Sequence, residues 1–462
     1  MIKSARKLCW LPLLAIVLML FPSGCSVSFK SPAELVEKPK LSVRNNLAKE
    51  AIQRELPKNT RLIRPLKPGT IRSVGYFDLD GDGQREAYAF YQSELNRMIG
   101  LLILREKDEA WEVISRTEIP GEDIAYADFV DFNSDGSMDL LFSSNTKEGV
   151  YGIINAYLWE DGEYKNIWFG EFNELVVDDM NGNKNKEILC VKHERGLYSG
   201  ISVYAYMDKS FQLIDELEMD LYINGYYNVF SGDLSEGQRA VFLDYNVGGK
   251  SASNVVLFRD EKLSSLLPLF SGERSKPGIK NGNVNSRDVD KDGIIEIAAN
   301  YSLPYSSGDE LDKKGMYSWN RYDESAETRF RTVALSFIDK KSYFEFVFPK
   351  RWMDAAERGR ISFVTSSEGH KRNFVSFFYL TENLDSYMLL TFEHFNQEDY
   401  DKFLKSESKK YFSIKNIFRR GNSRIVAYYN KNLEPEEEAD REAFRLLQIG
   451  NEEMNSLVNY IK

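Results

Sequence analysis

The stretch Asp78-Leu-Asp80-Gly-Asp82-Gly83-Gln-Arg-Glu86 decides the fold, because the same acidic loop returns along the 462-residue chain. The later copies begin at Asp131, Asp179, Asp233 and Asp288, at intervals of 48 to 55 residues. Apolar runs of four to eight residues flank each loop, and such runs are typical of strands. Recurrence at this interval indicates repeated structural units rather than one isolated motif.

A glycine stays in phase with these loops. Gly100, Gly152 and Gly200 follow the first aspartate of their loops by 21 or 22 residues, and each opens a run of β-branched or aromatic residues. Together with the flanking runs, this gives about four short strands per unit. We therefore predict a mainly β protein, a β-propeller of about five four-stranded repeats over residues 71–330. Solenoid stacking is the alternative, although the absence of helical periodicity excludes the helical solenoids.

The loop chemistry favours a hard cation. Oxygen-bearing side chains occupy positions 1, 3, 5 and 9 of the complete copies, and glycine at position 6 allows a sharp turn. An EF-hand is excluded because its glutamate belongs at position 12, where these loops have Ala89, Phe142 and Ala299. For any single loop, an Asx-rich turn without metal is the alternative. The recurrence of so many carboxylates, which repel one another without a cation, favours metal.

The acid at position 9 resembles the calcium loop of FG-GAP and VCBS repeats, which build the integrin alpha-chain propeller and many bacterial surface proteins. The resemblance implies structural Ca²⁺ held by three sets of ligands: Asp78, Asp80, Asp82 and Glu86; Asp131, Asn133, Asp135 and Asp139; Asp288, Asp290, Asp292 and Glu296. A weaker set, with two carboxylates and Lys184 in place of the glycine, is Asp179, Asn181, Asn183 and Glu187. The copy at Asp233 has Ala240 where the last ligand belongs, so we expect no ion there.

The N-terminus indicates export. Three basic residues precede an apolar stretch, Leu8 to Phe21, which is shorter than the ~20 residues that span a bilayer. Ser23-Gly24-Cys25 then resembles the bacterial lipobox. The resemblance implies a signal peptide over residues 1–24, lipidation of Cys25, and a protein anchored by lipid to the bacterial cell membrane, facing outside the cytoplasm.

Two further segments flank the repeats. Residues 25–70 read as a polar tether with one short helix around 46–56. Residues 331–462 mix strand-like and helical patterns, which predicts a separate small α+β domain. Its Phe348-Pro349 and Trp352 turn, followed by strands, resembles PsbP-like domains of other bacterial lipoproteins.

Composition and motifs restrict the function. A net charge of −11 disfavours nucleic acid as a partner. The three histidines, His193, His370 and His394, are scattered, and the usual nucleophile and phosphate-loop motifs are absent from the sequence, so no catalytic residue is assigned. The first hypothesis is a non-enzymatic, calcium-stabilised binding or scaffold protein for an unknown surface protein, peptide or glycan. The alternative is an extracytoplasmic carbohydrate-active enzyme that uses carboxylates in the propeller funnel.

Overall fold

The computed structural model describes residues 43–67, 70–108, 110–145, 151–267, 278–307, 314–366, 373–406, 412–431 and 433–461. The expected signal peptide and the lipidation residue Cys25 lie outside these ranges. Within them, no helix combines the length and the apolar character that a membrane crossing requires.

The chain begins with a helix that covers a sheet. Helix α3 (Val43–Glu55) spans most of the helical segment expected around residues 46–56. Ala48, Ala51 and Ile52 of α3 pack against the apolar side chains of the first sheet. That sheet contains β1 (Thr60–Leu62), β2 (Val74–Phe77), β3 (Glu86–Ser93), β4 (Met98–Lys107) and β5 (Ala110–Pro120). The strand β1 pairs with β3, so the end of the expected tether is part of the sheet.

Three more antiparallel sheets follow, each a meander of four consecutive strands with one extra strand in the last. The second contains β6 (Asp123–Val130), β7 (Asp139–Asn145), β8 (Gly152–Glu160) and β9 (Glu163–Phe172). The third contains β10 (Glu174–Asp178), β11 (Glu187–Glu194), β12 (Tyr198–Met207) and β13 (Ser210–Glu218). The fourth contains β14 (Ile223–Ser235), β15 (Gln238–Val247), β16 (Lys250–Arg259), β17 (Lys262–Ser265) and, beside β16, β18 (Ile279–Lys280).

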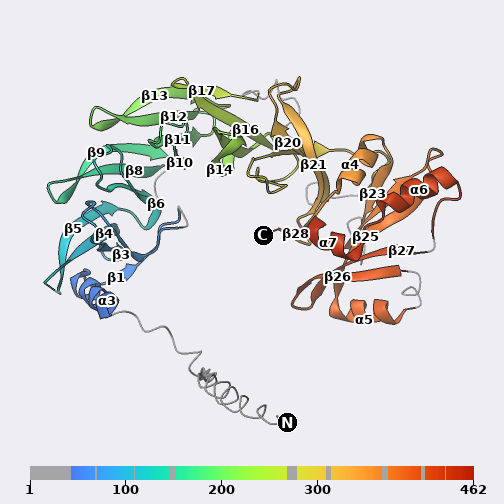
Figure 1. Cartoon of the computed structure of the whole chain (residues 1–462), viewed down its shortest axis with the longest axis horizontal. Helices are drawn as coiled ribbons and strands as arrows, with labels where there is room; N and C mark the ends of the chain where they lie inside the picture. The colour runs from blue at the N-terminus through green and yellow to red at the C-terminus, as the bar shows by residue number, and fades with distance from the viewer. Residues whose placement is uncertain are drawn as a thin grey trace, which may run out of the picture.

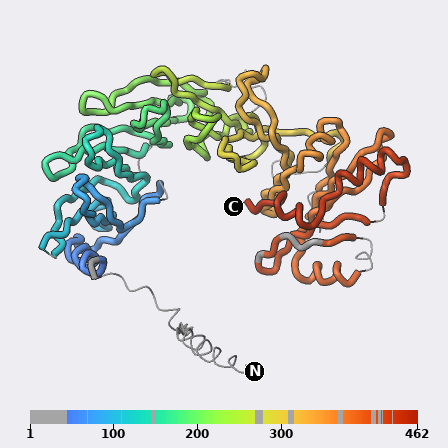
Figure 2. Tube along the Cα trace, viewed as in Figure 1, coloured from blue at the N-terminus to red at the C-terminus, as the bar shows by residue number. Residues whose placement is uncertain are grey.

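The fifth sheet extends past the expected domain boundary. It contains β19 (Ile297–Tyr301), β20 (Lys314–Tyr322), β21 (Phe330–Asp339), β22 (Phe344–Val347) and the C-terminal β28 (Val458–Tyr460). The boundary expected after residue 330 therefore falls at the start of β21, which pairs with β20 along its length. The chain end returns to this sheet, because β28 runs antiparallel to β22 (Figure 2).

The C-terminal module mixes helices with a sixth sheet. Its strands are β23 (Ile361–Thr365), β24 (Asn373–Leu380), β25 (Ser386–Asn396), β26 (Phe412–Arg420) and β27 (Ser423–Asn430). Its helices are α4 (Lys350–Glu357), α5 (Gln397–Lys405), α6 (Glu438–Leu447) and α7 (Asn451–Leu457). Trp352 of α4 is fully buried and donates its indole N–H to the Leu447 carbonyl at 2.7 Å.

Both faces of the central strands are buried, which explains the unbroken apolar runs of the sequence. In β7, Leu140 and Phe142 pack toward the first sheet, whereas Leu141 packs toward the third. Side chains of successive strand residues point to opposite faces of the sheet, so one strand contributes side chains to two apolar cores. Cys190 of β11, the one cysteine within the described residues, is buried in the core between the second and third sheets.

Successive sheets form an open arc (Figure 1). Separate apolar cores join the first sheet to the second, the second to the third, the third to the fourth, and the fourth to the fifth. The fifth sheet also packs against the C-terminal module, where Phe337 and Phe346 meet Phe377. Among the described residues, no apolar core joins the fifth sheet to the first. The prediction of a mainly β protein with several four-stranded sheets is confirmed.

Candidate metal sites in the acidic loops

The carboxylates at position 9 close the acidic loops. They lie at the first residue of the strand that follows the loop, or one residue before it in the case of Glu296, and are almost completely buried. In every complete copy, and in the weaker one, one carboxylate oxygen accepts a hydrogen bond from the backbone N–H of position 2. The pairs are Glu86 with Leu79 (2.8 Å), Asp139 with Phe132 (2.9 Å), Glu187 with Met180 (2.9 Å) and Glu296 with Val289 (3.0 Å).

Positions 1 and 6 fix the turn. Oδ2 of the first aspartate accepts a hydrogen bond from the N–H of position 6, which has a positive φ in all four loops. The donors are Gly83 (3.0 Å), Gly136 (3.0 Å), Lys184 (2.9 Å) and Gly293 (2.9 Å). Lys184 adopts a φ of +75°, a region that favours glycine, so the weaker loop keeps the geometry of the others without it. The loop conformation therefore does not depend on a complete set of carboxylates.

Two loops bring carboxylates together. Oxygens of Asp78, Asp80 and Asp82 lie within 4.8 Å of one another, as do oxygens of Asp288, Asp290 and Glu296. Each of these two groups could hold a metal ion. Glu86 and Asp292, which the sequence placed in the same sets, are not part of them.

One orphaned atom makes the first loop suitable for a cation. Asp78 Oδ1 is buried and has no hydrogen-bond partner among the described residues. A buried carboxylate oxygen without a donor is costly unless a cation or water satisfies it. Oxygen ligands of this kind suit Ca²⁺, so the residues present fit the ion.

The other two sets are not grouped in this way. In the part of the chain that the structure describes, Asp131, Asp135 and Asp139 form no such convergent group, and neither do Asp179 and Glu187. Both oxygens of Asp139 accept backbone hydrogen bonds, one from Phe132 and one from Trp159 at 3.0 Å. Burial raises the pKa of Asp139 to about 6 and that of Glu187 to about 7, although backbone N–H groups oppose the shifts.

Two arginines that the sequence analysis missed enter the convergent loops. Arg105 of β4 donates to Glu86 Oε1 at 2.9 Å and also binds Asp80. Arg321 of β20 lies 2.8 Å from Asp290, 2.7 Å from Asp292 and 2.6 Å from Glu296. The guanidinium groups therefore neutralise part of the negative charge in the same two loops that could hold metal.

Strand register explains why an arginine lies opposite the position-9 acid in these two loops but not in the loops at Asp131 and Asp179. Ala87 pairs with Leu104, and Ile297 pairs with Asn320, so the next residues, Arg105 and Arg321, face the position-9 acids. The same register places Leu158 in the second sheet and Ala205 in the third. A basic residue inside an apolar strand run was the available sequence signal, but the register was needed to interpret it.

The fourth, degenerate loop is closed by its own arginine. Arg239 Nη1 lies 2.9 Å from Asp233, and Nη2 binds Asp178. Ala240 pairs with Gly232, in the register that the position-9 acid occupies in the first sheet. The side chain at this position therefore offers no oxygen.

No protein-family model matches the chain, and no curated protein matches it. Among solved structures it is similar to the rhamnogalacturonan lyase YesW, with 13% identity over 58% of this chain and 67% of that chain at a TM-score of 0.29. A protein from Lactobacillus plantarum has 10% identity over 64% and 84% at a TM-score of 0.28, and the Dos1 propeller has 9% identity over 63% and 79% at 0.28. The mainly β character of the chain rests on its own antiparallel sheets.

Proposed function

We propose that the protein is a lipid-anchored, calcium-stabilised binding or scaffold protein that faces outside the cytoplasm of a bacterium. Its sheets belong to about five FG-GAP-like or VCBS-like propeller repeats, and Cys25 is the lipidated residue. One observation supports calcium binding above all: oxygens of Asp78, Asp80 and Asp82 lie close together, and the buried Asp78 Oδ1 has no hydrogen-bond partner among the described residues. In the fifth loop, Asp288, Asp290 and Glu296 supply a second set.

Three buried acids outside the loops are bound to neighbouring side chains and are not placed as a catalytic pair. Asp244 is fully buried and lies 2.7 Å from Lys280, which is fully buried as well. Glu345 is fully buried and paired with Arg287, and Glu393 accepts a hydrogen bond from the Tyr428 hydroxyl at 2.8 Å. A glycosidase needs two carboxylates that reach its substrate. These three hold the sheets together instead.

Calcium binding is tested by thermal unfolding of the 26–462 fragment in chelator and in about 5 mM calcium. At a dissociation constant of ~10⁻⁴–10⁻³ M, each occupied site adds roughly 1–2 kcal/mol to the free energy of unfolding. Asp80→Asn combined with Asp290→Asn should remove most of this calcium-dependent rise in Tm. Asp208→Asn, in the exposed turn between β12 and β13, is the matched control. Identical melting curves with chelator and with calcium would exclude the calcium sites.

The anchor and the binding role need separate experiments. Metabolic labelling with a palmitate analogue should modify the full chain and should be lost in Cys25→Ser. A pull-down with the 26–462 fragment, with and without calcium, then looks for a surface protein, peptide or glycan that is retained only by the calcium-loaded form. Turnover of polysaccharides by the same fragment would favour an enzyme instead.

A further inference from the structure

A cavity of about 480 Å³ lies in the C-terminal module, away from the acidic loops. Its walls come from α4, the end of β24 and α6. Small side chains leave this space open, because Ala355 of α4 and Ala439 and Ala443 of α6 line it. The volume is in the range of sites that hold small molecules.

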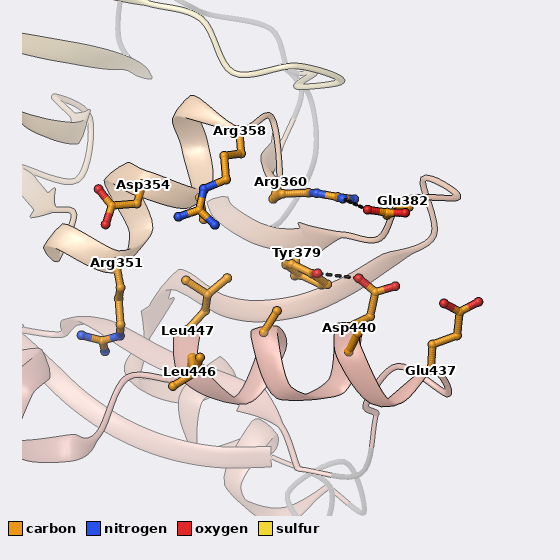
Figure 3. Close-up of a pocket in the computed structure, with 13 residues that line it drawn as sticks. Arg351, Asp354, Arg358, Arg360, Tyr379, Glu382, Glu437, Asp440, Leu446 and Leu447 are labelled. Atoms are coloured by element: carbon orange, nitrogen blue, oxygen red, sulfur yellow. Dashed lines mark hydrogen bonds and ion pairs between the residues drawn. The ribbon is translucent and has the colours of Figure 1, made fainter.

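One wall of the cavity is basic. Arg358 and Arg360 flank Gly359, whose φ of +71° turns the chain at the end of α4. Figure 3 shows both arginines on the side of the cavity opposite α6. Arg358 is exposed, and its side chain makes no hydrogen bond or ion pair with the residues that the structure describes. Arg360 donates to the Leu380 carbonyl at 3.4 Å and lies 2.8 Å from Glu382. Because the Glu382 side chain is 81% exposed, this ion pair contributes little, and a ligand carboxylate can replace it.

The facing wall offers hydrogen-bond acceptors. Tyr379 donates its hydroxyl to Asp440 Oδ1 at 2.6 Å, and both residues are buried. Burial, together with the Asp440 carboxylate, raises the pKa of Tyr379 to about 12, so the phenol keeps its proton. Glu437, which precedes Asp440 by three residues, also lines the cavity and lies at the N-terminal end of α6 (Figure 3). An N–H group of a ligand could donate to either carboxylate.

An apolar surface lies on α6, toward the C-terminal end of that helix. Leu446 of α6 lines the cavity although its side chain is 72% exposed, and Leu447 lies beside it. Ala443 continues this surface toward Asp440, one helical turn earlier. An aliphatic group placed here would cover Leu446 and remove apolar surface from water.

We propose that this cavity binds an aliphatic amino acid through its carboxylate, either as the free compound or as the C-terminal residue of a peptide. Arg358 and Arg360 bind the carboxylate, because a guanidinium fork matches its two oxygens. Asp440 accepts a hydrogen bond from the nitrogen, and the side chain packs on Ala443 and Leu446. A doubly charged phosphate is disfavoured by the four acids of the lining, Asp354, Glu382, Glu437 and Asp440.

Calorimetric titration of the full chain tests this site with three probes: leucine, N-acetyl-leucine and N-acetyl-leucinamide. We expect at least one of the two acids to bind, and the amide, which lacks the carboxylate, to bind at least about tenfold more weakly. Tighter binding of N-acetyl-leucine than of leucine identifies a peptide C-terminus as the ligand, and the reverse identifies the free amino acid. No binding of either acid, or equal binding of acid and amide, overturns the proposal.

Substitutions of the lining residues test whether the ligand binds in this cavity. Arg358→Gln and Arg360→Gln should each weaken binding of the acid about tenfold, whereas Arg331→Gln, an exposed arginine of β21, should leave it unchanged. Ala443→Leu should abolish binding by filling the cavity. Because that change could disturb the packing of α6, Leu446→Ser on the exposed surface provides a second test and should weaken binding severalfold. Full affinity in Arg358→Gln would contradict the assignment. The variant that combines Asp80→Asn with Asp290→Asn should bind these probes as the unchanged chain does, so a failure of the calcium proposal and a failure of this one can be told apart.

Discussion

At the scale of single residues, Arg321 binds Asp290 and Glu296, two of the three carboxylates that could hold a metal ion in the fifth loop. Arg321→Gln leaves Asp290, Asp292 and Glu296 without their guanidinium partner, and Glu296 is fully buried. We expect this change to lower the free energy of unfolding by about 2 kcal/mol in chelator. Calcium should restore most of the loss, because the ion can then occupy the space of the guanidinium. Urea denaturation measures both values, and an equal loss with and without calcium would count against a shared site.

A second residue-scale effect concerns pH. Burial lowers the pKa of His394, with a further lowering from Lys341 and an opposing effect of Asp339. Below pH ~6.5 the unfolded chain binds a proton that the folded protein binds less readily, so stability falls as the pH drops toward the folded pKa. His394→Gln should make the free energy of unfolding less dependent on pH between about 5 and 7. Burial likewise lowers the pKa of His193, so His193→Gln is the parallel test in another sheet. If the free energy of unfolding depends on pH in both variants as it does in the unchanged protein, this account is contradicted.

At the scale of elements, α3 covers the face of the first sheet that no other sheet covers. Ile52 is 2% exposed and packs with Ala87, Ala89 and Trp111. Ile52→Ala should lower the free energy of unfolding by about 2–4 kcal/mol through the lost contacts and the cavity left behind. The exposed neighbour Gln53 gives the control, since Gln53→Ala should change it by less than about 0.5 kcal/mol. Alanine favours the helix more than isoleucine or glutamine does, so helix propensity would not cause a loss in either variant. An equal loss of stability in both variants, measured in urea, would contradict packing of Ile52 as the cause.

Features that depend on contacts within one element could be predicted from the sequence, whereas contacts between elements could not. The loops at Asp78 and Asp288 were found because most of their carboxylates bind backbone N–H groups within the same nine residues. Arg105 and Arg321 were missed because their partners lie 19 to 31 residues away, across a strand pair whose register the sequence does not state. The boundary expected after residue 330 falls at β21 for a similar reason, since the repeat motif ends before its sheet does.

At the scale of the whole molecule, each sheet packs only with its neighbours, so damage to one core should stay local. Phe346 is fully buried between the fifth sheet and the C-terminal module, 5.3 Å from the Trp352 ring. We expect Phe346→Ala to lower hydrogen-exchange protection in β20 to β22 and in β24 and β25, while β3 and β4 keep theirs. Phe90→Ala, in the core between the first two sheets, should give the reverse pattern. Mass spectrometry of exchanged peptides separates the two regions, and a uniform loss of protection in either variant would mean that the arc unfolds as one cooperative unit.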